Sequence, residues 1–232
     1  RHMKVFGASL GLGRRLTWPD DFFTLYSELS YTHYDLLDWY FLMQTGQSNN
    51  LRLKFVLSRR SIDNPLYTRS GSDFSLGLEL TPPYSAFSDK DYSKVTDDQE
   101  LYRMIEYHKW TFKGGMFKTL DRADKLVLMT RVEGGFLGYY NKYLRSPFEK
   151  FTLGGDGMSG YSYYGSETIA LRGYENNSLT ATSLVTSAEG TGARQNGNMY
   201  TKMTMELRYP LTLQPSARSE EHTSELQSHT EI

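Results

Sequence analysis

Two stretches of the sequence combine residue types that can bind an ion or a phosphate or present a nucleophile. Residues 154–160, GGDGMSG, hold four glycines, but they lack the Gly-Lys-Ser/Thr of a phosphate loop and the spacing Gly-x-Ser-x-Gly. Residues 89–100, DKDYSKVTDDQE, place side-chain oxygens at positions 1, 3, 5, 9 and 12 of a calcium loop. Lys94 stands where that loop requires glycine. We therefore predict a flexible loop at the first stretch and no calcium site at the second.

Other chemistry is disfavoured by residues that are missing or isolated. The chain has no cysteine, which excludes disulfides, thiolate zinc sites and a catalytic thiol. His33 and His108 are isolated in the sequence, so we expect surface or lumen side chains rather than metal ligands. With 26 Lys and Arg against 27 Asp and Glu, the net charge of −1 argues against nucleic acid as a partner. The prediction is a protein that is not an enzyme and has no metal or cofactor.

An arginine in a long connection is the remaining chemical feature. Residues 139–197 are too long a link for a passive turn, and they contain the triplet Arg172, Gly173 and Tyr174. A guanidinium enclosed in a lumen needs a carboxylate, because an unpaired desolvated charge is costly. Gly173 permits a tight turn, and we expect Tyr174 to pack against the inner wall. The plainer interpretation is that Arg172 is one exposed arginine in a loop.

The elements that position this link are predicted from side-chain alternation with a period of two. One face of residues 50–60 is apolar and holds Leu51, Leu53, Phe55 and Leu57. The same pattern predicts strands at 22–34, 73–81 and 198–209, and less regular strands at 4–14, 101–113 and 125–138. Glu106 and His108 interrupt the apolar face of the strand at 101–113, which indicates a bulge there.

The lengths of the links between these strands alternate. Residues 15–21, 61–72 and 114–124 are short and rich in turn residues. Residues 35–49, 81–100 and 139–197 are longer. All short links therefore lie at one end of an up-and-down sheet and all long links at the other, an asymmetry typical of outer-membrane barrels.

Composition also favours a membrane barrel. No run approaches 18 apolar residues, which excludes a spanning helix, and a mean hydropathy of −0.56 suits strands that line a polar lumen. Aromatic residues predict two interfacial girdles, one at Trp18, Phe22 and Phe23 and the other at Tyr34, Trp39, Tyr40 and Phe41. The predicted fold is all-β: an antiparallel up-and-down transmembrane β-barrel, here a partial barrel of about seven strands forming an open curved sheet. The alternative is a soluble ligand-binding β-sandwich, whose second sheet would cover the apolar face.

The end of the sequence differs from the rest. Residues 218–232 show no alternation and few apolar side chains. The run RSEEHTSELQSH within them resembles the in-frame translation of a sequencing adapter. We therefore assign residues 1–217 to the partial barrel domain and regard residues 218–232 as an adapter-like or disordered tail, not native sequence.

Several segments resemble, in order, one family of outer-membrane proteins. Leu171-Arg172-Gly173-Tyr174 is similar to the Arg-Gly-aromatic signature of a loop that folds back into the lumen in the BamA family, part of the BamA/TamA surface-antigen superfamily. The preceding run SPFEKFTLGGDGMSGYS, with Phe148, Gly154 and Gly155, is similar to the lead-in to that loop. The later strand TMELRYPL resembles the next barrel strand, in which Glu206 matches the acidic partner of the loop arginine. The resemblance covers residues 3–215.

The resemblance implies a fragment of the machinery that folds and inserts outer-membrane proteins in the bacterial outer membrane. Its implied partners are outer-membrane lipids, unfolded outer-membrane protein substrates and, in the full-length protein, accessory assembly lipoproteins. Arg172 is then expected to pair with Glu206, whose position in the alternation lies on the polar face. The periplasmic POTRA domains and the barrel seam are expected outside this chain, and both sheet edges are expected to be bare. A two-partner-secretion or related translocation barrel is the alternative.

Overall fold

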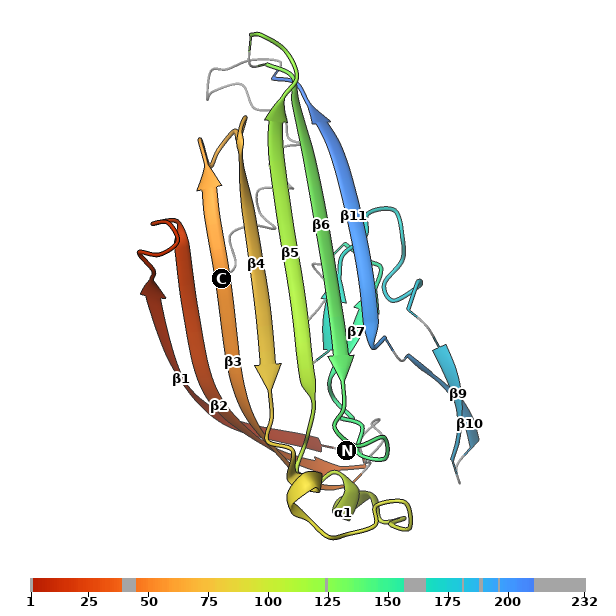
Figure 1. The fold of residues 1–232 in the computed structure, drawn as a ribbon. Helices are drawn as coiled ribbons and strands as arrows, with labels where there is room; N and C mark the ends of the chain where they lie inside the picture. Colours follow the sequence, from red (N-terminus) through yellow and green to blue (C-terminus); the bar gives the residue numbers. More distant parts are fainter. Residues whose placement is uncertain are drawn as a thin grey trace.

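A curved antiparallel sheet of seven strands forms the body of the molecule (Figure 1). The structure is a computed structural model that describes residues 2–38, 45–123, 125–156, 166–180, 182–187, 190–195 and 197–210. Neighbouring strands follow in the order β1-β2-β3-β4-β5-β6-β11. Their bounds are β1 His2–Arg15, β2 Phe23–Leu37, β3 Gly46–Ile62, β4 Gly71–Leu80, β5 His108–Thr119, β6 Val127–Gly138 and β11 Met199–Arg208. The predicted seven-stranded open sheet is confirmed.

The smaller elements lie in the two longest connections. The link between β4 and β5 holds a 3-10 helix, η1 (Tyr84–Phe87), and the short helix α1 (Asp98–Leu101). The link between β6 and β11 holds four short strands, β7 (Lys150–Leu153), β8 (Ser166–Ile169), β9 (Thr182–Ser187) and β10 (Gly190–Gln195). β7 and β8 pair in parallel, whereas β9 and β10 form an antiparallel pair. No helix in the described ranges is long and apolar enough to cross a membrane.

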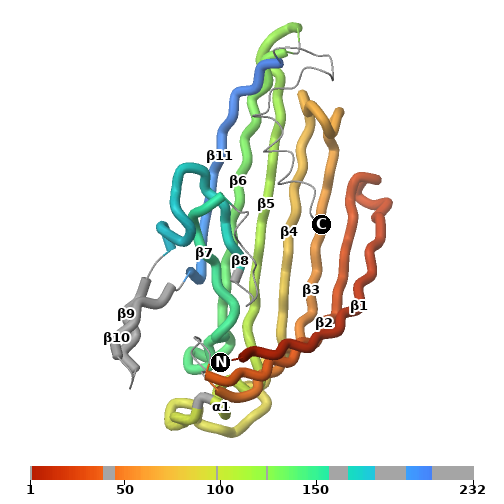
Figure 2. Tube along the Cα trace, turned by 180° about the vertical axis from the view of Figure 1, so that it is seen from behind, coloured from red at the N-terminus to blue at the C-terminus, as the bar shows by residue number. Residues whose placement is uncertain are grey.

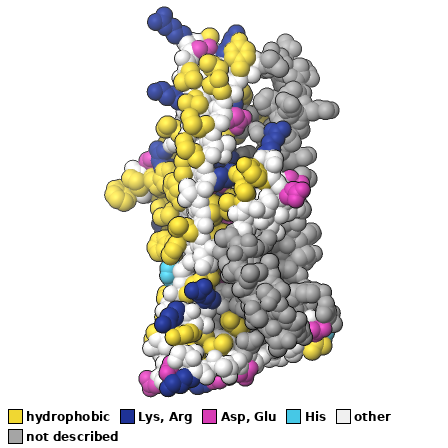
Figure 3. All heavy atoms as spheres, turned by 90° about the vertical axis from the view of Figure 1, so that its right-hand side faces the viewer, with side chains coloured by type: hydrophobic (Ala, Val, Ile, Leu, Met, Phe, Trp, Pro, Cys, Tyr) yellow, Lys and Arg dark blue, Asp and Glu magenta, His cyan; other side chains and the backbone are white. Residues whose placement is uncertain are grey.

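One face of the large sheet is apolar and stays uncovered. Register places apolar side chains opposite one another across the strands, as in the row Leu10, Leu29, Leu53 and Leu80. Leu10 is 79% exposed, and across the sheet Leu207 is still 63% exposed. Hydrophobic side chains form a broad strip on the described part of this side of the molecule (Figure 3). Among the described residues no second sheet covers this apolar face, which fits a lipid-facing wall and removes the β-sandwich alternative.

An aspartate closes each of the three short links. The Asp20 carboxylate accepts the N–H of Phe22 at 3.0 Å, between β1 and β2. Asp63 accepts two backbone N–H groups between β3 and β4, the nearer at 3.0 Å. Asp121 accepts the N–H of Lys125 at 2.8 Å and that of Leu126 at 3.0 Å, between β5 and β6. These bonds satisfy turn amides that no strand pairs, and they hold the pKa of Asp121 below its ordinary value.

The strand predicted at 101–113 is wrong in its bounds, because β5 begins at His108 and ends at Thr119. Glu106, which broke the predicted apolar face, lies before the strand and is 1% exposed. Its carboxylate accepts hydrogen bonds from the backbone N–H and the hydroxyl of Ser85, at 2.8 and 2.7 Å. An ordered connection, rather than a bulge, explains the interrupted pattern.

The same connection covers part of β3 that extends beyond β4. Leu53 of β3 pairs with Leu80, the last residue of β4, so the earlier part of β3 has no partner strand on that side. Asn49 fills this gap by forming a parallel bridge with Met104. The N–H of Asn49 donates to the Arg103 carbonyl at 2.9 Å, which satisfies a backbone group at an otherwise open edge.

The main hydrophobic core lies on the concave side, near the end of the sheet that carries the long links. Tyr34 belongs to this core and is 7% exposed, so the prediction that it faces a membrane interface is wrong. Tyr34 has the same alternation parity as Glu28 and Ser30, and this parity directs all three to the inner face. Trp18 and Phe22 at the short-link end are exposed, as the girdle prediction requires. Residues 39–41, the rest of the predicted girdle, lie outside the described residues.

Candidate functional site

The connection between β6 and β11 comprises residues 139–198, and its described part that carries β7 and β8 folds back onto the concave side of the sheet (Figure 2). We call this connection the returning segment. Figure 2 shows its strands β7 and β8 beside β6 and β11, on the inner side of the curve. The Ser146 side chain begins the return by accepting the N–H groups of Phe148 and Glu149, at 3.3 and 3.2 Å. The backbone N–H of Phe151 then donates to the Gly197 carbonyl at 2.7 Å, which joins the two ends of the segment.

Two phenylalanines anchor the returning segment to the wall. Phe148 is 1% exposed and stacks on Tyr34 of β2, with ring centroids 4.3 Å apart. Phe151 is fully buried and meets Tyr200 of β11 edge-on, with centroids 4.8 Å apart. Gly135 of β6 makes room for this contact, because a Cβ at that position would overlap the rings of Phe151 and Tyr200. The segment therefore spans the inner face from β2 to β11.

A tight turn carries the arginine triplet. The N–H of Tyr174 donates to the Leu171 carbonyl at 3.3 Å, and Gly173 has a φ of +88°. A positive φ at the third residue of a hydrogen-bonded turn is the type II arrangement, which strongly favours glycine. Arg172 occupies the second position of the turn. The predicted tight turn at Gly173 is therefore what the backbone forms.

Two glycines clamp this turn from the opposite side. Gly155 accepts the N–H of Leu171 at 2.9 Å and donates its own N–H to the Tyr174 carbonyl at 3.0 Å. Gly154 and Gly155 have φ values of +111° and +100°. A Cβ at Gly154 would overlap the backbone of the turn region, and a Cβ at Gly155 would overlap the Asn176 side chain. Gly154 and Gly155 therefore belong to a hydrogen-bonded clamp, whereas residues 157–160 of the predicted flexible loop lie outside the described residues.

The structure does not bring Arg172 and Glu206 together. Arg172 is exposed, and among the described residues it has no ion-pair partner. Glu206 lies on the inner face of β11, as alternation predicted, and pairs with Arg208 at 2.9 Å. Tyr174 is 51% exposed, so its expected packing against the inner wall is wrong. The turn lies beyond the free edge of β11 (Figure 1), so the Arg172–Glu206 pair stays a prediction that requires the turn to approach β11.

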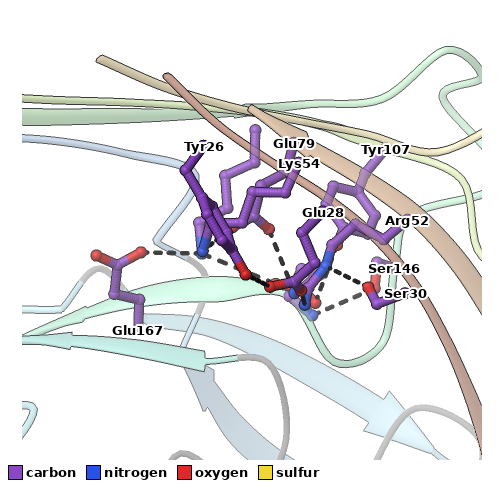
Figure 4. A network of polar contacts seen from close by, with 11 residues as sticks. Tyr26, Glu28, Ser30, Arg52, Lys54, Glu79, Tyr107, Ser146 and Glu167 are labelled. Atoms are coloured by element: carbon purple, nitrogen blue, oxygen red, sulfur yellow. Dashed lines mark hydrogen bonds and ion pairs between the residues drawn. The ribbon is translucent and has the colours of Figure 1, made fainter. Parts of the chain in front are cut away.

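Sequence reasoning missed a network of charged side chains on the inner wall. Cross-strand register aligns Glu28, Lys54, Glu79 and Lys109 in one row over β2, β3, β4 and β5. Arg52 bridges Glu28 and Glu79 at 3.4 and 3.5 Å, and Lys54 contacts Glu79 at 3.2 Å (Figure 4). Opposite charges on neighbouring strands stabilise the pairing register. One sequence feature could have indicated the network: every charged residue in this row lies on the polar face of its strand.

Glu149 of the returning segment sits beside this network. Its carboxylate accepts the Tyr107 hydroxyl at 3.3 Å and lies 3.8 Å from the Lys109 ammonium. Burial raises the pKa of Glu149 to about 7; Glu79 adds to the rise, whereas Lys109 and Arg52 oppose it. The carboxyl therefore changes its charge near neutral pH.

We expect docking of the returning segment to weaken as the pH rises. Because Glu149 has a pKa of about 7 in the docked state and 4.5 when exposed, its proton favours docking, and this contribution is lost as pH rises from about 4.5 through 7. A single cysteine at the buried Thr152 of β7 reports undocking by its rate of reaction with a maleimide. The labelling rate of the Glu149 protein is divided by that of a Glu149→Gln protein at the same pH, and this ratio should increase between pH 5 and 8. An unchanged ratio across this range contradicts the expectation.

The acidic stretch at 89–100 forms local contacts. Asp91 accepts the hydroxyl of Ser93 at 2.6 Å and pairs with Lys94 at 3.3 Å. In the described parts of the chain, no group of three or more His, Asp or Glu side chains is placed to hold a metal ion.

An open arc of β-barrel with a bare apolar exterior and a charged interior is the architecture of an outer-membrane barrel. The chain belongs to the Omp85 superfamily, because a model of the Omp85 superfamily domain matches residues 2–224. This is a family of bacterial outer-membrane proteins for membrane insertion or translocation. Among solved structures, the chain is similar to the crystal structure of BamA from Haemophilus ducreyi lacking POTRA domains 1–3, with a TM-score of 0.61 and 18% identity. That likeness covers 95% of this chain and 39% of the other, so the chain spans well under half of the solved protein. A search of curated proteins gives no significant match.

Proposed function

We propose that this chain is the loop-bearing part of a barrel that folds and inserts other β-barrel proteins into the bacterial outer membrane. The observation that supports this most directly is the turn at Arg172, which two hydrogen bonds to Gly155 hold in place. These hydrogen bonds fix the backbone position from which the exposed Arg172 side chain projects, as a recognition element requires. Family membership supports the same assignment.

The physical task needs no catalytic group. A strand that enters lipid must pair its backbone N–H and C=O groups, since each unpaired group in hydrocarbon costs several kcal/mol. β1 and β11 are the outer strands of the described sheet, and each has one neighbour strand. In the proposed function the whole barrel offers such strand edges, directly or through adjoining strands, to unfolded outer-membrane proteins. Outer-membrane lipids and accessory assembly lipoproteins are the other proposed partners.

Replacing Arg172 by alanine tests the proposal. In the full-length protein, we expect Arg172→Ala to abolish or strongly reduce complementation of a strain depleted of the resident protein. Levels of assembled outer-membrane barrels should fall, while the variant itself remains folded, because Arg172 is exposed and contributes little to packing. Complementation is scored by growth and by the heat-modifiable mobility of outer-membrane barrels on gels.

Arg145→Ala is the matched control, because Arg145 is another exposed arginine of the returning segment that lies outside the clamped turn. This variant should complement normally. If Arg172→Ala also complements, the proposed role of the turn is wrong. Depletion of the resident protein could also leave outer-membrane barrels intact and block the release of one secreted protein. That result would support the alternative function, a translocation pore, and reject the insertion of barrel proteins.

A further inference from the structure

One buried lysine of the wall faces two carboxylates of the returning segment. Lys109 lies on the inner face of β5, and its ammonium contacts Glu167 of β8 at 2.9 Å and Glu149 at 3.8 Å. We infer that Lys109 is a positioning residue that holds the returning segment against the wall and so fixes the place of the Arg172 turn. This inference rests on the proposed function of that turn, although docking itself can be measured without it.

The Lys109 ammonium is buried among groups that stabilise a positive charge. Its side chain is 7% exposed, and that of Glu149 is 4% exposed. The ammonium also lies 5.0 Å from the centroid of the buried Phe151 ring, in a cation–π contact. Glu79 is its direct neighbour on β4. Because a desolvated ammonium without partners is costly, removing the segment would leave this lysine with Glu79 alone.

Charge complementarity between the wall and the returning segment also supports a docking role for Lys109. The wall part of the network has three cations, Arg52, Lys54 and Lys109, but only two carboxylates, Glu28 and Glu79. The returning segment brings the Glu167 carboxylate to this excess of positive charge, whereas Glu149 beside it favours docking in its protonated form. The attraction is therefore directed from a cationic wall to an acidic segment, and Lys109 is the wall cation that both segment carboxylates contact.

The contact at Glu167 leads directly to the arginine turn. β8 ends at Ile169, whose carbonyl accepts the N–H of Gly154 at 3.1 Å. Two residues later, Leu171 donates to Gly155 at 2.9 Å and begins the clamped turn. Lys109 thus holds the strand that leads into the turn, and loss of the ion pair should displace the turn without any change at Arg172 itself.

The test uses the single cysteine at Thr152, which is 4% exposed, in the full-length protein in its membrane. We expect Lys109→Met to raise the maleimide labelling rate about tenfold or more, since a charged hydrogen bond and an ion pair are lost. Lys109→Arg should stay within about threefold of the parent, because it keeps the charge and a donor. Glu167→Gln should also release the segment, whereas Glu149→Gln should not, because Glu149 lies farther from the ammonium.

Lys202→Met is the matched control, because Lys202 pairs at 3.8 Å with Glu133 of the neighbouring strand rather than with the segment. It should leave Thr152→Cys protected. A charge exchange, Lys109→Glu with Glu167→Lys, should restore part of the protection that either single change removes. The inference is overturned if Lys109→Met and Glu167→Gln both keep the cysteine protected, or if Lys202→Met exposes it equally. Failure of the Arg172 test with success here would reject the proposed function but not the docking role of Lys109.

Discussion

Replacing Phe151 by alanine is expected to release the returning segment from the wall, with a loss of about 3 kcal/mol or more in the free energy of docking. The side chain is fully buried, packs on Tyr200 and lies beneath the Lys109 ammonium. Alanine would remove the ring from a place that Gly135 leaves vacant for it, so the wall could not close the cavity without moving β6. The change removes hydrophobic burial and the cation–π contact together.

Maleimide labelling of Thr152→Cys measures this effect, and the labelling rate should rise by about 100-fold, the equivalent of roughly 3 kcal/mol. Phe87→Ala is the control, since that phenylalanine is 82% exposed at the end of η1 and should leave the rate unchanged. Phe151→Leu should give an intermediate rate, because it keeps part of the apolar volume. Equal protection in the Phe151→Ala and parent proteins would show that the aromatic anchor does not hold the segment.

Replacing Gly155 by alanine should disable the arginine turn while the rest of the sheet stays folded. The residue has a φ of +100°, which costs a non-glycine residue of order 1–3 kcal/mol, and its new Cβ would overlap the Asn176 side chain. The Asn176 amide must turn away from the new Cβ, and the strain at position 155 weakens the hydrogen bonds that Gly155 makes with Leu171 and Tyr174. We expect complementation by the full-length Gly155→Ala protein to fall as far as that by Arg172→Ala.

Gly173→Ala separates strain from steric overlap. Gly173 has a comparable φ of +88°, but no heavy atom lies within 4 Å of the position that a Cβ would take, so alanine there costs only conformational strain. Its defect should therefore be milder, and hydrogen exchange of the Leu171 amide should stay slower than in Gly155→Ala. If the two alanine variants behave alike, the clamp at Gly155 has no role beyond allowing a positive φ.

Alternation along single strands was enough to predict the wall but not its contacts. Leu51, Leu53 and Phe55 marked β3 because a strand with one lipid-facing side must repeat every two residues. Lys109 could not be singled out, because its partners depend on the register between β4 and β5 and on a segment that returns from 40 residues or more along the chain. Long-range pairing of this kind is set by packing of the whole sheet, which no local pattern encodes.

The candidate site was predictable in part for similar reasons. Gly173 was recognisable because glycine readily takes the positive φ that a tight turn can demand, which is a local requirement. The exposure of Tyr174 was not, since it follows from the clamp that Gly154 and Gly155 form across the segment. Alternation also indicates the inward position of Tyr34, because Tyr34 and Glu28 are an even number of residues apart on β2 and so share a face. The girdle prediction for Tyr34 relied instead on its position near the end of the strand.

The unequal lengths of β3 and β4 shape the surface that the protein presents to its surroundings. β3 has 17 residues, about 56 Å at 3.3 Å per residue, whereas a tilted strand crosses the hydrocarbon layer with about 9–11 residues. β4 has 10 residues and pairs with β3 only from Leu53 onward. β2 and β3 are therefore longer than a bilayer crossing requires, and their extra length is braced by the bridge at Asn49 and by the Tyr34–Phe148 stack. Beyond the end of β4, the connection that holds η1 and α1 completes the rim and bridges to β3 at Met104 (Figure 1). A large molecule at the membrane surface therefore meets this connection, rather than an open lumen, on the side of β4.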